Sequence, residues 1–149
     1  CEDDLGYVGD IDKINPNIIL DMLEKGYIPV IASVGTDEEG HTYNINADTA
    51  AAEIAGALSA ENMILVSDIP GLLFDKDDES TLIPLVHVYE VKGLEDKGII
   101  SGGMIPKVEC CVRAIRQNVK KAVIIDGRIP HSILIEMLSK EGIGTMFKR

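Results

Sequence analysis

Two short segments carry residue types that phosphate chemistry requires. The first brings two carboxamides and a carboxylate, on Asn44, Asn46 and Asp48, to the predicted start of a helix. The second brings a glycine pair and then Lys107 to the predicted start of another helix. Helix N-termini favour anions because unpaired backbone N–H groups and the positive end of the helix dipole lie there. A lysine that meets phosphate and a carboxylate that orients it are parts of a phosphoryl-transfer site.

Each of these residues also has a purely structural explanation. Aspartate in a first helical turn is favoured by the dipole by about 0.3–1 kcal/mol, and asparagine commonly caps helices and forms turns. The position of the three polar groups, after a predicted strand, favours binding because ligands bind at the carboxyl ends of strands in α/β sheets. The preceding glycines favour a binding role for Lys107 because they let backbone N–H groups approach phosphate closely.

The elements that must position these residues alternate between strands and helices. Continuous apolar runs predict buried strands at residues 28–32, 63–66 and 122–125, and a polar turn at 35–40 predicts a hairpin tip. Apolar residues at helical spacing and capping signals predict helices near residues 15–26, 46–58, 91–98, 105–119 and 130–142. In the last of these, we expect Ile133, Leu134, Met137 and Leu138 to face inward. This alternation predicts an α/β sandwich around a mainly parallel sheet.

Composition limits the class of protein further. The 149 residues suit a single domain, residues 1–149, and the 46% hydrophobic content with only 4% aromatics predicts an aliphatic core. The net charge of −11 argues against nucleic acid or an anionic membrane as a main partner. No apolar run approaches the ~18 residues of a membrane span, and no signal peptide is visible. We therefore expect a cytoplasmic protein.

Metal and nucleophile sites find no support in the sequence. The three cysteines and three histidines show no metal-ligand spacing, so we expect neither a protein-bound metal nor a disulfide framework. The chain contains no GxxxxGK[ST] phosphate loop and no GxSxG nucleophile motif.

Taken in order, segments spread along the chain resemble the amino-acid kinase family, in particular its branch that phosphorylates N-acetyl-L-glutamate in arginine biosynthesis. The resemblance is carried by DLGYVG at 4–9, YIPVIA at 27–32, NINADTAA at 44–51, SDIPGLL at 67–73, IISGGMIPKVECC at 99–111, IDGRIPHS at 125–132 and EGIGTM at 141–146. It implies a three-layer αβα sandwich of the carbamate-kinase-like type, of which this chain would be the C-terminal half.

The resemblance also implies an activity and roles for individual residues. The enzyme would transfer the γ-phosphoryl group of ATP, bound with Mg²⁺, to the side-chain carboxylate of N-acetyl-L-glutamate and so form an acyl phosphate. Lys107 would stabilise charge on the transferred group, Asp48 would orient lysines, and Asn44 and Asn46 would bind the amino-acid substrate. The nucleotide would be bound by Asp68, Ile69, Pro70, Gly71, Leu72, Leu73, Ile99, Ile100, Ser101, Gly102, Gly103 and Met104.

The family's N-terminal domain has no counterpart in these residues. That domain carries a glycine-rich phosphate loop, a second catalytic lysine and an arginine that binds substrate. Because these are missing, we expect the chain to be inactive alone. The first residue is Cys1 rather than Met, which is consistent with an excised domain. Near the C-terminus, Glu136, Gly142 and Gly144 resemble the arginine-sensitive branch, in which L-arginine is a feedback inhibitor. The full-length protein would form a homo-oligomer and could bind a nitrogen-signalling regulatory protein.

Two other interpretations remain open from the sequence alone. One is a sister kinase that acts on an aminoadipate derivative, because substrate choice depends heavily on the absent half. The other is a stand-alone module that binds a nucleotide or arginine and has no catalytic activity.

Overall fold

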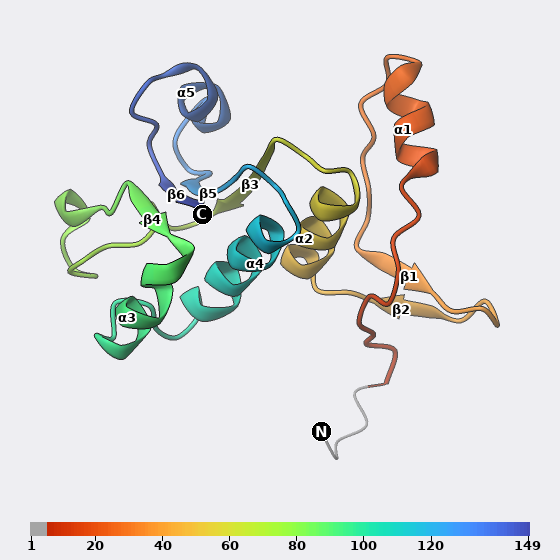
Figure 1. Cartoon of the computed structure of the whole chain (residues 1–149), viewed down its shortest axis with the longest axis horizontal. Coiled ribbons are helices and arrows are strands. Elements are labelled where there is room, and N and C mark those ends of the chain that lie inside the picture. Colours follow the sequence, from red (N-terminus) through yellow and green to blue (C-terminus); the bar gives the residue numbers. More distant parts are fainter. Residues whose placement is uncertain (1–5) are drawn as a thin grey trace.

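A computed structural model describes residues 6–149, which form an α/β fold (Figure 1). The elements in chain order are α1 (Asn17–Glu24), β1 (Val34–Thr36), β2 (Thr42–Asn44), α2 (Ala47–Ala57), β3 (Asn62–Ser67), η1 (Glu79–Thr81), β4 (Leu85–His87), η2 (Val88–Glu90), α3 (Val91–Asp96), α4 (Met104–Arg116), β5 (Lys121–Asp126), α5 (Ser132–Leu138) and β6 (Thr145–Lys148).

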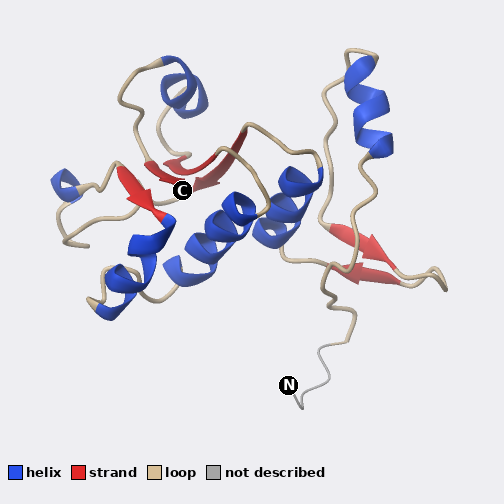
Figure 2. Cartoon of the chain, in the orientation of Figure 1, coloured by secondary structure: helices blue, strands red, loops and turns tan. Residues whose placement is uncertain are grey.

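The main sheet has four strands in the order β3-β5-β6-β4, and the hairpin β1–β2 forms a separate sheet (Figure 2). The pairs β3–β5 and β4–β6 are parallel, and β5–β6 is antiparallel. Ser67 pairs with Asp126, so the carboxyl ends of β3 and β5 lie at the same edge of the sheet. The predicted α/β class and mainly parallel sheet are confirmed.

Helices cover both faces of this sheet. Helices α2 and α4 contact β3 and β5 on one face, and α5 lies on the opposite side (Figure 1). Strand β5 contributes buried side chains to both faces of the sheet, because successive side chains of a strand point to opposite faces. Ala122 and Ile124 belong to the core beneath α2 and α4, and the alternating Val123 and Ile125 are buried on the other face.

Small residues allow α2 and α4 to pack closely together. Ala52 of α2 and Cys111 and Ala114 of α4 are completely buried. At the end of α2, a Cβ added to Gly56 would overlap the side chain of Gln117, which follows α4. Bulky side chains at these positions would push the helices apart, so the small residues set their separation.

The strand expected at residues 28–32 does not form. Ile28 is 90% exposed and Val30 is 96% exposed, although the apolar run resembles a buried strand. A strand needs a neighbour that supplies hydrogen bonds to its backbone, and no strand among residues 6–149 lies beside this segment. The preceding helix α1 forms as predicted but also buries none of its residues.

The orientation expected for the last helix is also wrong. All four apolar residues expected to face inward on α5 are exposed, and its buried residues are Ser132 and Glu136. The buried Glu136 carboxylate accepts a hydrogen bond from the Ile143 N–H at 2.9 Å, which holds this face of the helix against the molecule. The helix therefore turns a polar side toward the molecule.

A buried hydroxyl connects the loop after β3 to the last strand. Thr145 is completely buried in β6; its Oγ1 accepts a hydrogen bond from the Leu72 N–H (2.8 Å) and donates one to the Ile83 carbonyl (2.7 Å). The loop passes so close that a Cβ on Gly71 would lie 2.5 Å from Oγ1. Thr145 therefore fixes the position of the loop that the family resemblance associates with nucleotide binding.

We expect Thr145→Val to lower the free energy of unfolding by roughly 1–3 kcal/mol, because it leaves a buried N–H and a buried carbonyl unpaired while preserving side-chain shape. Urea unfolding of the chain measures this change. Thr42→Val, at an exposed position of β2, is the matched control and should stay within about 0.5 kcal/mol of the parent. Equal stability of the two variants would show that the Thr145 hydrogen bonds contribute nothing net.

Candidate functional site

An ion pair between two helix starts lies at the centre of the candidate site. Asp48 is in the first turn of α2, and Lys107 is the fourth residue of α4. Lys107 Nζ lies 3.1 Å from Asp48 Oδ2, and the two side chains retain 27% and 28% of their exposed area. Neighbouring atoms cover most of both side chains, which holds the pair in place, and the remaining exposed area lets a ligand contact them.

A turn containing the glycine pair leads into α4. Gly102 adopts the left-handed conformation with φ 55°, which a side chain would disfavour. The N–H groups of Met104 and Ile105 donate to the carbonyls of Ser101 and Gly102, at 3.1 and 3.2 Å. Lys107 therefore projects one helical turn beyond a glycine-containing loop, as the sequence predicts.

Asn46 has a demonstrable role as the N-cap of α2. Its Oδ1 accepts hydrogen bonds from the Thr49 N–H (3.1 Å) and the Thr49 hydroxyl (3.4 Å). A cap satisfies one of the backbone donors that the first helical turn leaves unpaired. The carbonyl oxygen of Asn46 is thus occupied within α2, whereas its exposed amide nitrogen has no hydrogen bond among residues 6–149.

Asn44 is held by its backbone and exposes its side chain. Its N–H donates to the Tyr7 carbonyl (2.7 Å), and its carbonyl accepts from the Gly9 N–H (3.1 Å). On the other side of β2, Asn44 pairs in register with Val34 of β1. Ile45, the next residue, is 5% exposed and anchors the chain before α2 begins. The site residues Asn44, Asn46 and Asp48 therefore follow one another along a fixed backbone.

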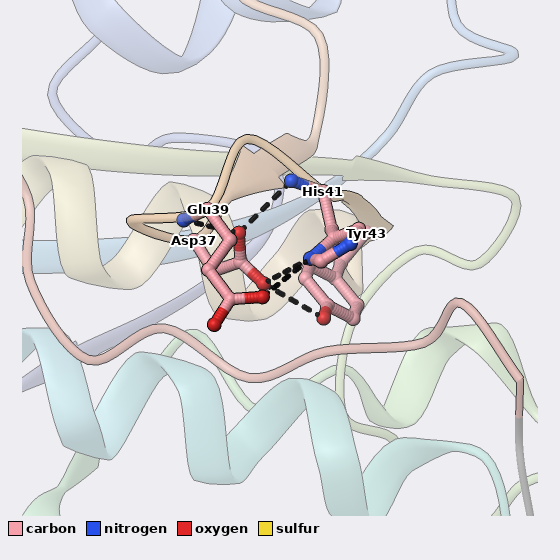
Figure 3. Close-up of polar contacts among 4 residues, drawn as sticks. All are labelled: Asp37, Glu39, His41 and Tyr43. Carbon is pink, nitrogen blue, oxygen red and sulfur yellow. Dashed lines mark hydrogen bonds and ion pairs between the residues drawn. The ribbon is translucent and has the colours of Figure 1, made fainter.

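A carboxylate at the tip of the hairpin fixes its shape (Figure 3). Asp37 Oδ1 accepts hydrogen bonds from the backbone N–H groups of Glu39 (3.0 Å) and His41 (2.9 Å). Asp37 Oδ2 accepts from the Tyr43 hydroxyl and lies beside His41 Nδ1, both at 3.0 Å. Burial alone would raise the pKa of Asp37, but the bonds from His41, Tyr43 and Glu39 together hold that pKa below its ordinary value. The ionised Asp37 thus keeps the hairpin in register up to Asn44.

The first predicted nucleotide loop divides into exposed and buried parts. Asp68 is exposed and accepts a hydrogen bond from the Ser67 hydroxyl (3.2 Å). Gly71 and Leu72 are buried against Thr145, and Ile69 and Pro70 are half-buried. Direct contact with a ligand is therefore open to only part of the loop.

At the end of the neighbouring strand β5, Arg128 forms a bidentate pair with the buried Asp126. Its Nε and Nη2 donate to the carboxylate at 2.7–3.2 Å. Hydrogen bonds from the side chain and backbone of Arg128 hold the pKa of Asp126 below its usual range. The exposed guanidinium also lies within electrostatic range of Asp68. The pair fixes the position of the Arg128 guanidinium near the carboxyl edge of β3 and β5.

A pocket of about 330 Å³ lies between the two predicted nucleotide loops. Three of its lining residues were predicted from the sequence: Leu73, Ile99 and Ser101. Five others were missed: Phe74, Asp75, Lys76, Lys97 and Gly98. The exposed Phe74, one of only two phenylalanines, was a signal that could have indicated them. Ile100 is 2% exposed and packs in the core, so it supports the pocket wall from behind.

The C-terminal residues expected to form an effector site serve different structural roles. Glu136 is 5% exposed, and its Oε2 accepts the Ile143 N–H at 2.9 Å. A Cβ on Gly142 would lie 2.5 Å from the same carboxylate. Gly144 instead lies against the backbone of β5, where an added Cβ would overlap the Ile124 carbonyl. Glu136 and Gly142 are brought together, whereas Gly144 allows close strand packing.

Among residues 6–149, no group of three or more His, Cys, Asp or Glu side chains could hold a metal ion. Over the same residues, every helix is too short or too polar to cross a bilayer.

The chain is similar to known proteins over nearly its whole length. Residues 1–126 match the amino acid kinase family. The chain is 53% identical to an acetylglutamate kinase of Brachyspira hyodysenteriae over 99% of its own length and 51% of that relative. It is 55% identical to an acetylglutamate kinase of Clostridium beijerinckii over 97% of its length and 51% of that relative. The chain thus spans about half the length of these curated relatives.

Solved structures share the fold. N-acetylglutamate synthase from Neisseria gonorrhoeae, in complex with coenzyme A and L-arginine, superposes with a TM-score of 0.88 at 25% identity, over 98% of this chain and 33% of that one. Carbamate kinase from Giardia lamblia bound to AMP-PNP superposes with a TM-score of 0.65 at 17% identity, over 91% of this chain and 45% of that one. The second likeness concerns the fold alone.

We expect Asn46→Ala to lower the free energy of unfolding by about 0.5–2 kcal/mol, because it removes the cap of α2. Asn46→Ser is the matched control, since serine also caps well and should retain most of the stability. Thermal or urea unfolding of both variants checks this result. If Asn46→Ala were as stable as the parent, the side chain would not act as a cap.

Proposed function

The chain belongs to the amino acid kinase family, and we propose that it forms the ATP-binding half of an acetylglutamate kinase about twice its length. Relatives with that name are more than 50% identical over nearly all of this chain, yet extend to twice its length. The observation that carries the proposal is the Lys107–Asp48 pair, which lies one helical turn beyond the glycine turn.

The reaction begins with an oxygen of the side-chain carboxylate of N-acetyl-L-glutamate. This oxygen attacks the γ-phosphorus of ATP, the bond from that phosphorus to the β,γ-bridging oxygen breaks, and ADP leaves as the acyl phosphate forms. The attacking carboxylate is already ionised at neutral pH, so no general base is required. Catalysis then depends on in-line positioning and on neutralising charge that develops in the transition state.

Lys107 and Asp48 have different roles in stabilising this transition state. The ammonium group of Lys107 stabilises negative charge on the transferring phosphoryl group and on the leaving oxygen. Asp48 cannot contribute positive charge; it holds Lys107 in place through the 3.1 Å ion pair. ATP enters as its Mg²⁺ complex, and the metal arrives with the substrate.

The amino-acid substrate lies next to the same helix start. The exposed side chain of Asn44 and the amide nitrogen of Asn46 offer neutral donors to its carboxylate or acetyl oxygens. The nucleotide occupies the pocket between the two loops, and its phosphates run past Gly102 and Gly103 toward Lys107. The remaining half of the enzyme supplies further phosphate and substrate contacts, so the 149 residues alone are inactive.

L-arginine is proposed as an effector at the C-terminal end. The support is the buried Glu136 carboxylate, which accepts only the Ile143 N–H among residues 6–149 and so retains acceptor capacity for a guanidinium or ammonium group. The similar synthase from Neisseria gonorrhoeae was solved with L-arginine bound. This assignment is independent of the catalytic one.

The test is an assay of the full-length enzyme with MgATP and N-acetyl-L-glutamate, in which hydroxylamine traps the acyl phosphate as a hydroxamate. N-acetyl-L-2-aminoadipate is the competing substrate, and it should turn over more slowly because its carboxylate lies one methylene further away. Faster turnover of the aminoadipate derivative would identify the sister kinase. Failure of both substrates would favour a non-catalytic binding module.

We expect Lys107→Ala to lower kcat by roughly 10²–10³-fold, by analogy with the loss of one oxyanion donor, while KM for ATP changes much less. The effect on kcat exceeds the effect on KM because the negative charge that Lys107 stabilises develops only in the transition state. Steady-state kinetics of the full-length enzyme measure both constants. Lys92→Ala, at an exposed position of α3, is the control and should behave like the parent. A near-normal kcat in Lys107→Ala would show that Lys107 has no catalytic role.

A further inference from the structure

The side chains of Tyr43 and Asn44 lie on opposite faces of the β1–β2 hairpin. The two residues are neighbours in β2, and successive side chains of a strand point to opposite faces. Tyr43 is half-buried, whereas Asn44 is exposed. Tyr43 is therefore placed to support the backbone at Asn44 and not to contact a ligand that Asn44 binds.

One end of the Tyr43 side chain is held by the tip of the hairpin (Figure 3). Its hydroxyl donates a hydrogen bond to Asp37 Oδ2 at 3.0 Å. The other oxygen of the same carboxylate accepts hydrogen bonds from the backbone N–H groups of Glu39 and His41, so Asp37 is fixed from two sides. The hydrogen bond to Asp37 raises the pKa of Tyr43, so at neutral pH the hydroxyl keeps the proton that it donates.

The other end of the same side chain packs against the segment that holds Asn44. A Cβ added to Gly9 would lie 2.9 Å from the Tyr43 Cβ and 3.2 Å from its Cγ, so no larger residue fits between them. The Gly9 N–H donates to the Asn44 carbonyl at 3.1 Å, and the Asn44 N–H donates to the Tyr7 carbonyl at 2.7 Å. Tyr43 thus packs on the segment whose two backbone hydrogen bonds fix Asn44.

The hairpin needs this support because its own strands are short. Strands β1 and β2 have three residues each and form a separate two-stranded sheet. An isolated two-stranded hairpin is at best marginally stable in water. The contacts of Tyr43 with Asp37 and Gly9 therefore contribute much of the order at Asn44.

We propose that Tyr43 is a positioning residue for the amino-acid substrate, which acts by bridging Asp37 and Gly9 and so holding Asn44 where its side chain contacts that substrate. This inference rests on the proposed function, in which Asn44 binds N-acetyl-L-glutamate. Among residues 6–149, neither the lining of the nucleotide pocket nor the Lys107–Asp48 ion pair includes Tyr43. Loss of its contacts should therefore affect the amino-acid substrate more than the nucleotide or the chemical step.

Steady-state kinetics of the full-length enzyme, with KM measured separately for N-acetyl-L-glutamate and MgATP, test this selectivity. We expect Tyr43→Phe, which loses only the hydroxyl, to raise KM for N-acetyl-L-glutamate about threefold to tenfold, the size of one lost hydrogen bond. The values of kcat and of KM for MgATP should change much less. Tyr43→Ala, which also loses the ring, should have a larger effect of the same kind. Tyr89→Ala removes an exposed ring outside the hairpin and is the control.

The Asn44→Ala background tests whether Tyr43 acts through Asn44. Asn44→Ala should itself raise KM for N-acetyl-L-glutamate, and adding Tyr43→Ala should raise it no further, because the positioned group is already gone. An equal rise in both backgrounds would overturn the inference. An equal rise of KM for both substrates would overturn it too, since general loosening of the fold has that effect.

Hydrogen–deuterium exchange of the full-length enzyme supplies a second measurement that does not depend on catalysis. The Asn44 N–H should exchange faster in Tyr43→Ala than in the parent, because the segment that accepts its hydrogen bond is less well held. Unchanged exchange would overturn the positioning role whatever the activity.

The two measurements together separate failure of this inference from failure of the proposed function. If the parent forms the acyl phosphate and Tyr43→Ala leaves KM for N-acetyl-L-glutamate unchanged, this inference alone is overturned. If the parent forms no acyl phosphate but Tyr43→Ala speeds exchange at Asn44, the kinase assignment is overturned and the support of Asn44 by Tyr43 stands.

Discussion

The close packing of α2 against α4 is the constraint on which the candidate site depends. Completely buried small residues on both helices allow the approach, and Gly56 has no room for a side chain against Gln117. Because both helices begin at the same end of this packed pair, their first turns bring a carboxylate and an ammonium group within 3.1 Å. Neither side chain could fix that distance alone, since a lysine side chain has many rotamers. Small buried residues in the core thus determine the geometry of the Asp48–Lys107 pair.

A second set of contacts positions the loops around this pair. Thr145 anchors the loop at Leu72, the buried Ile100 supports the loop before α4, and Asp37 fixes the hairpin that leads to Asn44. Thr145 and Asp37 lie outside the residues expected to touch substrate or nucleotide, and Ile100, which was expected to bind the nucleotide, is buried beneath its loop. The ligand-facing side chains remain exposed because neighbouring side chains and backbone groups hold the backbone beneath them. This division allows the site to stay open without losing its geometry.

Elements that depend on local interactions could be predicted from the sequence, whereas features that depend on contacts between distant segments could not. Strands β3 and β5 and helices α2 and α4 followed from apolar runs, caps and glycines. The expectation that Asp48 orients lysines came from the resemblance to the amino-acid kinase family. The strand expected at residues 28–32 failed because hydrogen-bonding partners decide strand formation, and none lie within residues 6–149. The face of α5 was misjudged because the helix buries Ser132 and Glu136, and the contact of Glu136 with the Ile143 N–H cannot be read from the apolar spacing. That Phe74, Lys76 and Lys97 line one pocket could not be predicted, because the pocket arises only when two distant loops meet.

The central claim is that Asp48 acts by holding Lys107, and a double-mutant cycle in kcat of the full-length enzyme tests it most directly. The cycle compares the parent, Asp48→Asn, Lys107→Ala and the double variant. If Asp48 acts through Lys107, the double variant will lose much less activity than the product of the two single losses, because the second change removes an interaction already broken. Independent roles would give the full product. A double variant whose kcat falls by that product would contradict the account.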